Sequence, residues 1–175
     1  EDKRLKTRHG RVEFIVTMKY IEEIVKNYKK PKILDLGAGC GAYSIPLSEY
    51  YDVTALELVK HNLKVIEKNS QNIKLIHGNA TNLNMLEDNS FDVILMDVMM
   101  PVMDGLTATK RIRKLKRKDA RTVPVIAMTA NVFNEDIIAA KEAGMNEHIA
   151  KPLDFDKLIH TLAKYFLKMD KKLIS

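Results

Sequence analysis

Six short apolar runs, most of them followed by a helix-forming segment, constrain the fold of this chain more than any other feature. The runs lie at residues 33–36, 52–57, 72–79, 91–97, 123–129 and 148–152. Strands that alternate with helices pair in parallel, and right-handed crossovers place the helices on both faces of the sheet. The sequence therefore predicts an α/β fold with a doubly wound, six-stranded parallel sheet.

Length and composition fit one globular domain spanning residues 1–175. Hydrophobic residues make up 46% of the chain and charged residues 30%, which is ordinary for such a domain. No apolar run approaches the roughly 20 residues that cross a bilayer, and the first residues lack a secretory signal, so we expect no membrane association. The single cysteine, Cys40, cannot form an internal disulfide. We expect a cytoplasmic protein.

The net charge of +6 is concentrated in the segment "KRIRKLKRK", residues 110–118. Such a run could bind phosphates. The alternative is a solvated helix face whose last cations suit the negative end of the helix dipole. No aromatic residue interleaves with the charges, so we favour the solvated face and do not expect a nucleic acid partner.

A glycine-rich loop follows the first strand in "ILDLGAGCGAYS", with Gly37, Gly39 and Gly41. Glycine lets the backbone turn tightly and approach a ligand closely. Glu57, about 20 residues further on at the end of the second strand, has the place of a carboxylate that binds ribose hydroxyls. The alternative is that the glycines only form a strand-to-helix turn, although Glu57 makes a nucleotide site the favoured interpretation.

Residues 1 to about 95 resemble a class I S-adenosylmethionine-dependent methyltransferase. The resemblance is carried by "RHGRVEFIVTMKYI", predicted as a leading helix, and by "ILDLGAGCGAYS", "ALEL" and "HGNATNL". It implies that Asp35 and the glycine loop hold the methionine end of S-adenosylmethionine, and that Glu57 binds its ribose. It also implies that Leu58 contacts the adenine face and that Asn79 with Ala80 contacts the adenine edge. Asn79 replaces the aspartate that is commonest there.

Residues from about 91 to 167 resemble a different family, the receiver domains of response regulators. The matching segments are "LMDVMMPVMDG", "VIAMTAN" and "MNEHIAKPLD". The resemblance implies that Asp97 accepts a phosphoryl group, that the Thr129 hydroxyl follows this group, and that the Lys151 ammonium neutralises it. It also implies a cis bond before Pro152.

Each resemblance lacks a part. A receiver needs an acidic pair after its first strand to hold Mg²⁺, but "GAGCG" stands there, with Asp35 inside the strand, and His148 replaces the usual switch aromatic. We therefore expect no Mg²⁺, no metal site and no histidine kinase that acts efficiently on the chain. No methyl-acceptor region follows the fourth strand, so we assign no catalytic residue.

We interpret the mixture as an engineered chimera of a methyltransferase-like fragment, residues 1–90, and a receiver-like, flavodoxin-like fragment, residues 91–175. Joining the two gives a Rossmann-like strand order 3-2-1-4-5-6. The chimera would have no complete native activity and at most residual binding of S-adenosylmethionine or S-adenosylhomocysteine. The alternatives are a methyltransferase of unknown acceptor and a phospho-accepting receiver of two-component signalling.

Overall fold

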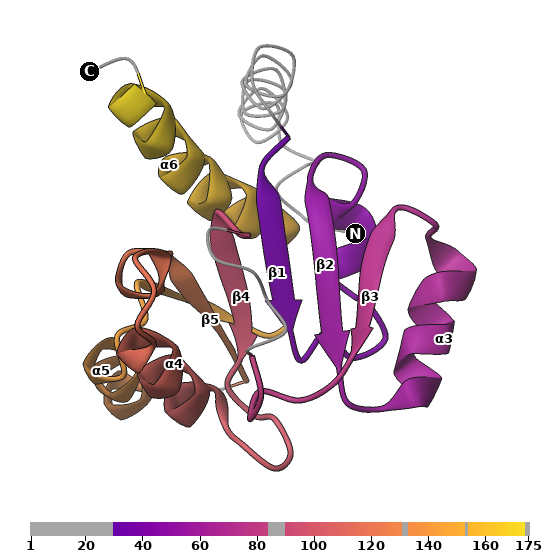
Figure 1. Cartoon of the computed structure of the whole chain (residues 1–175), viewed down its shortest axis with the longest axis horizontal. Coiled ribbons are helices and arrows are strands. Elements are labelled where there is room, and N and C mark those ends of the chain that lie inside the picture. Colours follow the sequence, from indigo (N-terminus) through magenta and orange to yellow (C-terminus); the bar gives the residue numbers. More distant parts are fainter. Residues whose placement is uncertain (1–29, 84–89, 131–132, 153, 174–175) are drawn as a thin grey trace.

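The six strands form one parallel sheet with the order β3-β2-β1-β4-β5-β6 (Figure 1). The computed structural model describes residues 30–83, 90–130, 133–152 and 154–173. The predicted fold class and strand order are confirmed. The predicted leading helix lies outside the described residues.

The strands lie close to the predicted apolar runs. They are β1 (Lys32–Leu36), β2 (Asp52–Glu57), β3 (Ile73–His77), β4 (Val93–Asp97), β5 (Val125–Thr129) and β6 (Glu147–Ala150). The helical elements are α2 (Ser44–Leu47), α3 (Lys60–Asn69), α4 (Gly105–Lys114), the 3-10 turn η1 (Asp119–Arg121), α5 (Asn134–Glu142) and α6 (Phe155–Leu173).

Successive side chains of a strand point to opposite faces of the sheet, so each central strand contributes to two cores. In β4, Val93 and Leu95 pack with residues of α2, α3 and α6, whereas Ile94 and Met96 pack with residues of α4, η1 and α5. All four side chains are buried. Burial on both faces explains why the strand sequences are apolar throughout instead of alternating.

The helix ends follow the local capping chemistry with one difference from the prediction. Asp104 caps α4 by accepting from the Thr107 backbone N–H at 2.8 Å, and Asp154 accepts from Lys157 N–H at 3.1 Å, as predicted for α6. Asn134 is not the cap of α5. The cap is Phe133, which has no side-chain oxygen, and Asn134 is the first helical residue.

Helix α2 has only 4 residues, whereas the sequence predicts a helix over residues 42–51. Within the described residues, no helix is both long and apolar enough to cross a membrane.

Candidate functional site

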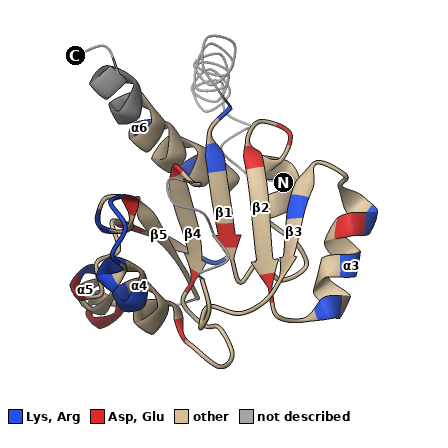
Figure 2. Cartoon of the chain, in the orientation of Figure 1, with Lys and Arg blue, Asp and Glu red and all other residues tan. Residues whose placement is uncertain are grey.

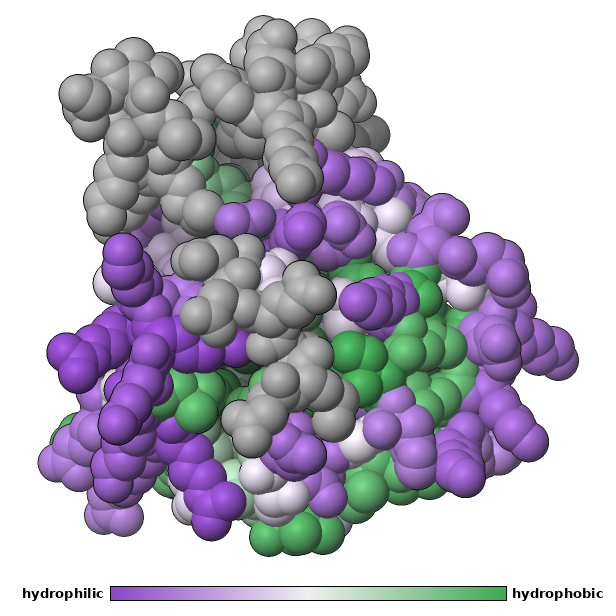
Figure 3. Space-filling view, in the orientation of Figure 1, coloured by the Kyte–Doolittle hydropathy of each residue, from purple (hydrophilic) through white to green (hydrophobic). Residues whose placement is uncertain are grey.

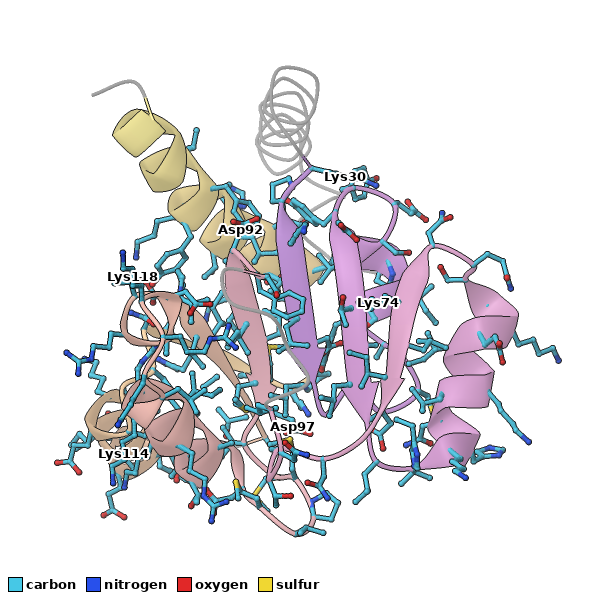
Figure 4. The ribbon with its side chains drawn as sticks, in the orientation of Figure 1. Lys30, Lys74, Asp92, Asp97, Lys114 and Lys118 are labelled. Carbon is cyan, nitrogen blue, oxygen red and sulfur yellow. The ribbon has the colours of Figure 1, made fainter. Side chains whose placement is uncertain are left out.

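Asp97 and Lys151 form an ion pair at the carboxyl end of the sheet. Asp97 is the last residue of β4, and Lys151 follows the last residue of β6, two strands away. The Lys151 Nζ lies 2.9 Å from Asp97 Oδ2, and both side chains retain some exposure, 29% for the lysine and 19% for the aspartate. Figure 4 shows Asp97 at the opposite end of β4 from Asp92. Parallel strands bring the pair together because all their carboxyl ends meet at one edge.

The strand between them, β5, ends in the third predicted residue of this site, Thr129. It pairs with Ala150 in the ladder, and its carbonyl accepts the Lys151 backbone N–H at 2.7 Å. The peptide bond between Lys151 and Pro152 is cis, as predicted. Asp97, Thr129 and Lys151 are therefore on three adjacent strand ends of one edge.

A cavity of about 30 Å³ lies beneath this edge on the side of α5. Thr129, Asp136 and His148 line it together with apolar side chains. The volume is that of about one water molecule, which is too small for an organic ligand. His148 and Thr129 thus line the same small cavity.

Asp35 is a buried carboxyl on β1, the strand beside β4. It is only 3% exposed, and its Oδ2 accepts the Ser44 hydroxyl at 2.6 Å. Burial raises the pKa of Asp35 to about 6, opposed by the Ser44 hydrogen bond and the Lys151 charge and reinforced by Asp97 and Glu57. Asp35 therefore belongs electrostatically to the same site as Asp97.

The glycine loop packs against the chain itself. A Cβ at Gly37, where φ is +83°, would lie 2.8 Å from Met100 Sδ and 3.0 Å from Asp97 Cβ. A Cβ at Gly41 would meet Ile66 at 2.8 Å and Ile45 at 3.0 Å. Two of the three glycines are thus required by close contacts inside the fold. Only Gly39 faces open space.

Glu57 connects the glycine loop to the start of α3 through its two carboxylate oxygens. Its Oε2 accepts the Gly39 N–H at 2.9 Å, and its Oε1 accepts the Val59 N–H at 2.8 Å and the Asn62 amide at 3.3 Å. The side chain is 7% exposed. The carboxylate that the sequence assigns to a ribose is therefore bonded to the start of α3 and to the loop.

The remaining predicted cofactor residues also have partners inside the fold. The Leu58 carbonyl bonds to the His77 ring at 3.0 Å, and the Asn79 side chain accepts from the Thr81 N–H at 2.9 Å. Ala80 is buried in the core on the α4 side. Leu58 directly follows β2, and Asn79 and Ala80 lie in the segment after β3.

Tyr43 and Gly105 lie near Asp97, and sequence reasoning missed Tyr43 and included Gly105 only as the end of the receiver-like segment "LMDVMMPVMDG". Lys151 Nζ lies 6.0 Å from the centroid of the Tyr43 ring, and burial raises the pKa of Tyr43, as do the charges of Asp35 and Asp97. Gly105 begins α4 so close to the site that a Cβ there would lie 2.4 Å from the Asp97 carbonyl oxygen. The Tyr43 contact has no local sequence pattern, because it joins segments far apart in the chain.

No group of three or more histidine, cysteine, aspartate or glutamate side chains that could hold a metal occurs among the described residues. The positions that follow β1 are Gly37 and Ala38, and Asp35 is bonded to Ser44. The site is therefore an aspartate-lysine pair with a buried second carboxyl.

Comparison with known sequences places this arrangement in a family. The family described as response regulator receiver domain matches residues 52–163, more than half of the chain. The chain therefore belongs to the response regulator receiver domain family.

The relatives with similar sequences include a hybrid histidine kinase and a transcription factor. A segment of 82 residues is 44% identical to hybrid signal transduction histidine kinase M of Dictyostelium discoideum, covering 46% of this chain and 3% of that protein. A segment of 75 residues is 41% identical to transcription factor SKN7 of Saccharomyces cerevisiae, covering 43% of this chain and 11% of that protein. The matched segments are thus a small part of these long relatives.

Among solved structures, the receiver domain of a sensor histidine kinase from Pseudomonas aeruginosa PAO1 superposes with a TM-score of 0.50. The two chains are 28% identical, and the match covers 78% of this chain and 98% of the other. That structure has a magnesium ion coordinated in its active-site cleft.

These findings correct the interpretation as an engineered chimera. The family match begins at residue 52 and runs without a break across residues 90 and 91, where the two fragments were expected to join. No methyltransferase segment is seen, so that assignment is wrong, and S-adenosylmethionine binding has no support. The physical reason lies in the contacts above: Glu57, Asp35 and the glycines serve the fold's own packing and hydrogen bonds.

Proposed function

We propose that this chain is a phosphoryl-accepting receiver module in which Asp97 is the acceptor. The observation that carries the proposal is the Asp97–Lys151 pair, with 2.9 Å between Oδ2 and Nζ, at a partly exposed strand end. A partly exposed carboxylate can be reached by a donor, and a fixed ammonium beside it can offset the charge that a phosphoryl group brings. The kinases among its relatives indicate a phosphohistidine of a histidine kinase or relay protein as the donor.

The transfer uses the Asp97 carboxylate of this chain, the phosphohistidine of the donor and a proton from solvent. One Asp97 oxygen attacks the phosphorus of the phosphohistidine, and the oxygen–phosphorus bond forms as the nitrogen–phosphorus bond breaks. The electron pair stays on the imidazole, which takes a proton from solvent. Oδ1 of Asp97 accepts the Met99 N–H at 3.0 Å and Oδ2 contacts Lys151, so the carboxylate is held in one orientation. Thr129 ends the neighbouring strand β5, and we expect its hydroxyl to bond a phosphoryl oxygen.

Magnesium is the cation that the Pseudomonas aeruginosa receiver holds in its cleft. Mg²⁺ prefers an octahedron of oxygen ligands that includes one or more carboxylates. In this chain the residues after β1 are glycine and alanine, and the nearest carboxyl, Asp35, is buried and bonded to Ser44. The residues present do not fit a receiver magnesium site, so Lys151 carries the charge neutralisation.

Intact-mass spectrometry after incubation with acetyl phosphate tests the proposal. We expect the wild-type chain to gain the mass of one phosphoryl group, at a rate that changes little when Mg²⁺ is replaced by a chelator. Asp97→Asn should gain nothing. Lys151→Met should react about 100-fold more slowly, because one fixed charge facing the developing oxyanions is lost.

Asp92→Asn is the matched control, since Asp92 lies at the amino end of the same strand and accepts the Lys32 N–H at 2.8 Å. It should be phosphorylated like the wild type. Absence of any added mass on wild-type protein that is folded by circular dichroism, with Mg²⁺ and without it, would refute the proposal. Mass that persists in Asp97→Asn would place the modification elsewhere and refute it equally.

A further inference from the structure

The excess of positive over negative charge in this protein comes from one segment. Residues 105–123, which comprise α4, η1 and the loop between them, contain eight lysine or arginine residues and one aspartate, a net charge of +7. The whole chain has a net charge of +6, so everything outside this segment sums to −1. Figure 2 shows the blue residues gathered over α4 and the loop that follows it.

Six of these cations are exposed, and they surround a rigid centre. The exposed residues, here called the basic patch, are Lys110, Arg111, Lys114, Lys116, Lys118 and Arg121. Arg113 is half-buried and ties the segment together, because its Nη1 donates to the carbonyls of Ala120 and Val123, each at 2.9 Å. The guanidinium therefore holds α4 against the η1 turn, and the exposed cations lie on these two elements and the loop between them. Figure 4 shows Lys114 and Lys118 on the same side of the molecule.

The only carboxylate inside the segment does not interrupt the patch. Asp119 pairs with Arg117, whose Nη2 lies 2.6 Å from Asp119 Oδ2. The nearest acidic helix is α5, with Glu135 and Asp136 in its first turn. It borders α4 on the same face of the sheet and so limits the patch on that side (Figures 1 and 2).

The patch has no apolar anchor. The exposed large hydrophobic side chains among the described residues are Val59, Met99, Val102, Phe133 and Ile138, and none of them lies within residues 105–123. Figure 3 shows a largely hydrophilic surface over α4, whereas hydrophobic surface appears at the lower edge, where the loop after β4 lies. Protein partners usually bury apolar or aromatic anchors at the centre of an interface. A phosphate backbone requires only positioned cations.

Although the sequence alone favours a solvated helix face here, we propose that the basic patch binds the phosphate backbone of nucleic acid without base specificity. Lysine ammonium groups contact phosphates as point charges, and four of the six patch residues are lysines. Contacts to phosphate position a protein on nucleic acid but carry no sequence information. The patch is separate from the Asp97 site and does not depend on phosphorylation.

Fluorescence anisotropy of the full chain with a short, labelled DNA duplex of mixed sequence tests this proposal between about 50 and 200 mM salt. We expect the logarithm of affinity to fall linearly with the logarithm of salt concentration, with a slope of about −0.9 for each phosphate contact, hence about −5 when the six patch cations each contact one phosphate. The variant Lys110→Gln, Lys114→Gln, Lys118→Gln should lose more than tenfold in affinity at low salt. Its slope should become shallower by about 3, since one contact is lost per lysine.

The matched control is Lys60→Gln, Lys64→Gln, Lys68→Gln on α3, whose three lysines are also exposed. It removes the same charge from another helix and should leave both affinity and slope unchanged. Equal losses in the two variants would overturn the proposal, because only net charge would then matter. Absence of binding by the wild type, or displacement of the duplex by polyglutamate at equal charge concentration, would overturn it as well.

Discussion

Arg113 is the side chain whose replacement tests the packing of the α4 side most sharply. Its Nε and Nη2 donate to the Gly144 carbonyl at 3.0 and 2.8 Å, and Nη2 also donates to Asn146 Oδ1 at 3.0 Å. Together with the two bonds to Ala120 and Val123, one guanidinium makes five hydrogen bonds. These bonds connect α4 to η1 and to the turn between α5 and β6.

Arg113→Met removes all five donors and keeps an unbranched apolar stem. Each bond contributes about 0.5–1.5 kcal/mol, and the carbonyls left behind lose a charged donor. Water can reach part of this half-buried site and replace some of the bonds, so the sum is reduced to roughly 3 kcal/mol. Arg113→Lys should recover only part of it, because an ammonium cannot reach four acceptors in different directions.

Urea unfolding followed by circular dichroism measures the effect. With a slope of about 1–3 kcal/mol per molar urea, the Arg113→Met midpoint should fall by about 1 M or more. Lys110→Met, an exposed substitution in the same helix, should change stability by no more than about 0.5 kcal/mol. A loss of less than about 1 kcal/mol in Arg113→Met would refute the reasoning that this guanidinium organises the α4 segment.

Gly105→Ala should destabilise the chain by more than about 2 kcal/mol, since the new Cβ would lie 2.4 Å from the Asp97 carbonyl oxygen, and thermal unfolding would show it. A melting temperature like that of the wild type would contradict this. The Asp35 pKa of about 6 lies above its ordinary value of 3.8. The folded state then binds the extra proton, so stability should fall by on the order of 2 kcal/mol as pH rises from about 4 to 6. Asp35→Asn should flatten this dependence in denaturant titrations, and an unchanged profile would exclude Asp35 as its source.

Strand positions and their parallel arrangement could be predicted because they depend on local composition. Apolar runs such as residues 93–97 can be satisfied only by a strand covered on both faces, and the alternation with helices fixes the direction of pairing. Asp97, Thr129 and Lys151 could be placed at one edge for the same reason. The short length of helix α2 could not be predicted, because a helix of 4 residues depends on its packing against β2 more than on its own sequence.

The glycine loop shows where sequence reasoning failed. Three glycines and a following glutamate are equally compatible with a ligand and with close packing, since both need the absence of a Cβ. Only the structure shows that Met100 and the Asp97 side chain occupy the space over Gly37 and that Glu57 bonds to Gly39. The receiver family match extends across residue 90, and it shows that the interpretation as a chimera is wrong.

The sequence by itself determined the class of fold, the strand order and the edge at which the acidic and basic residues of the site meet. The class of fold and the edge follow from hydrophobic periodicity and from the geometry of parallel strands, whereas the strand order was predicted by joining the two fragments that resemble known families. The tertiary structure alone decided which partners the polar groups have. Asp35 with Ser44, Glu57 with Gly39, and Arg113 with Gly144 are contacts between separate elements. A buried polar side chain bonds to whichever polar group lies within hydrogen-bond distance. The distances between separate elements are set only when the whole chain has packed.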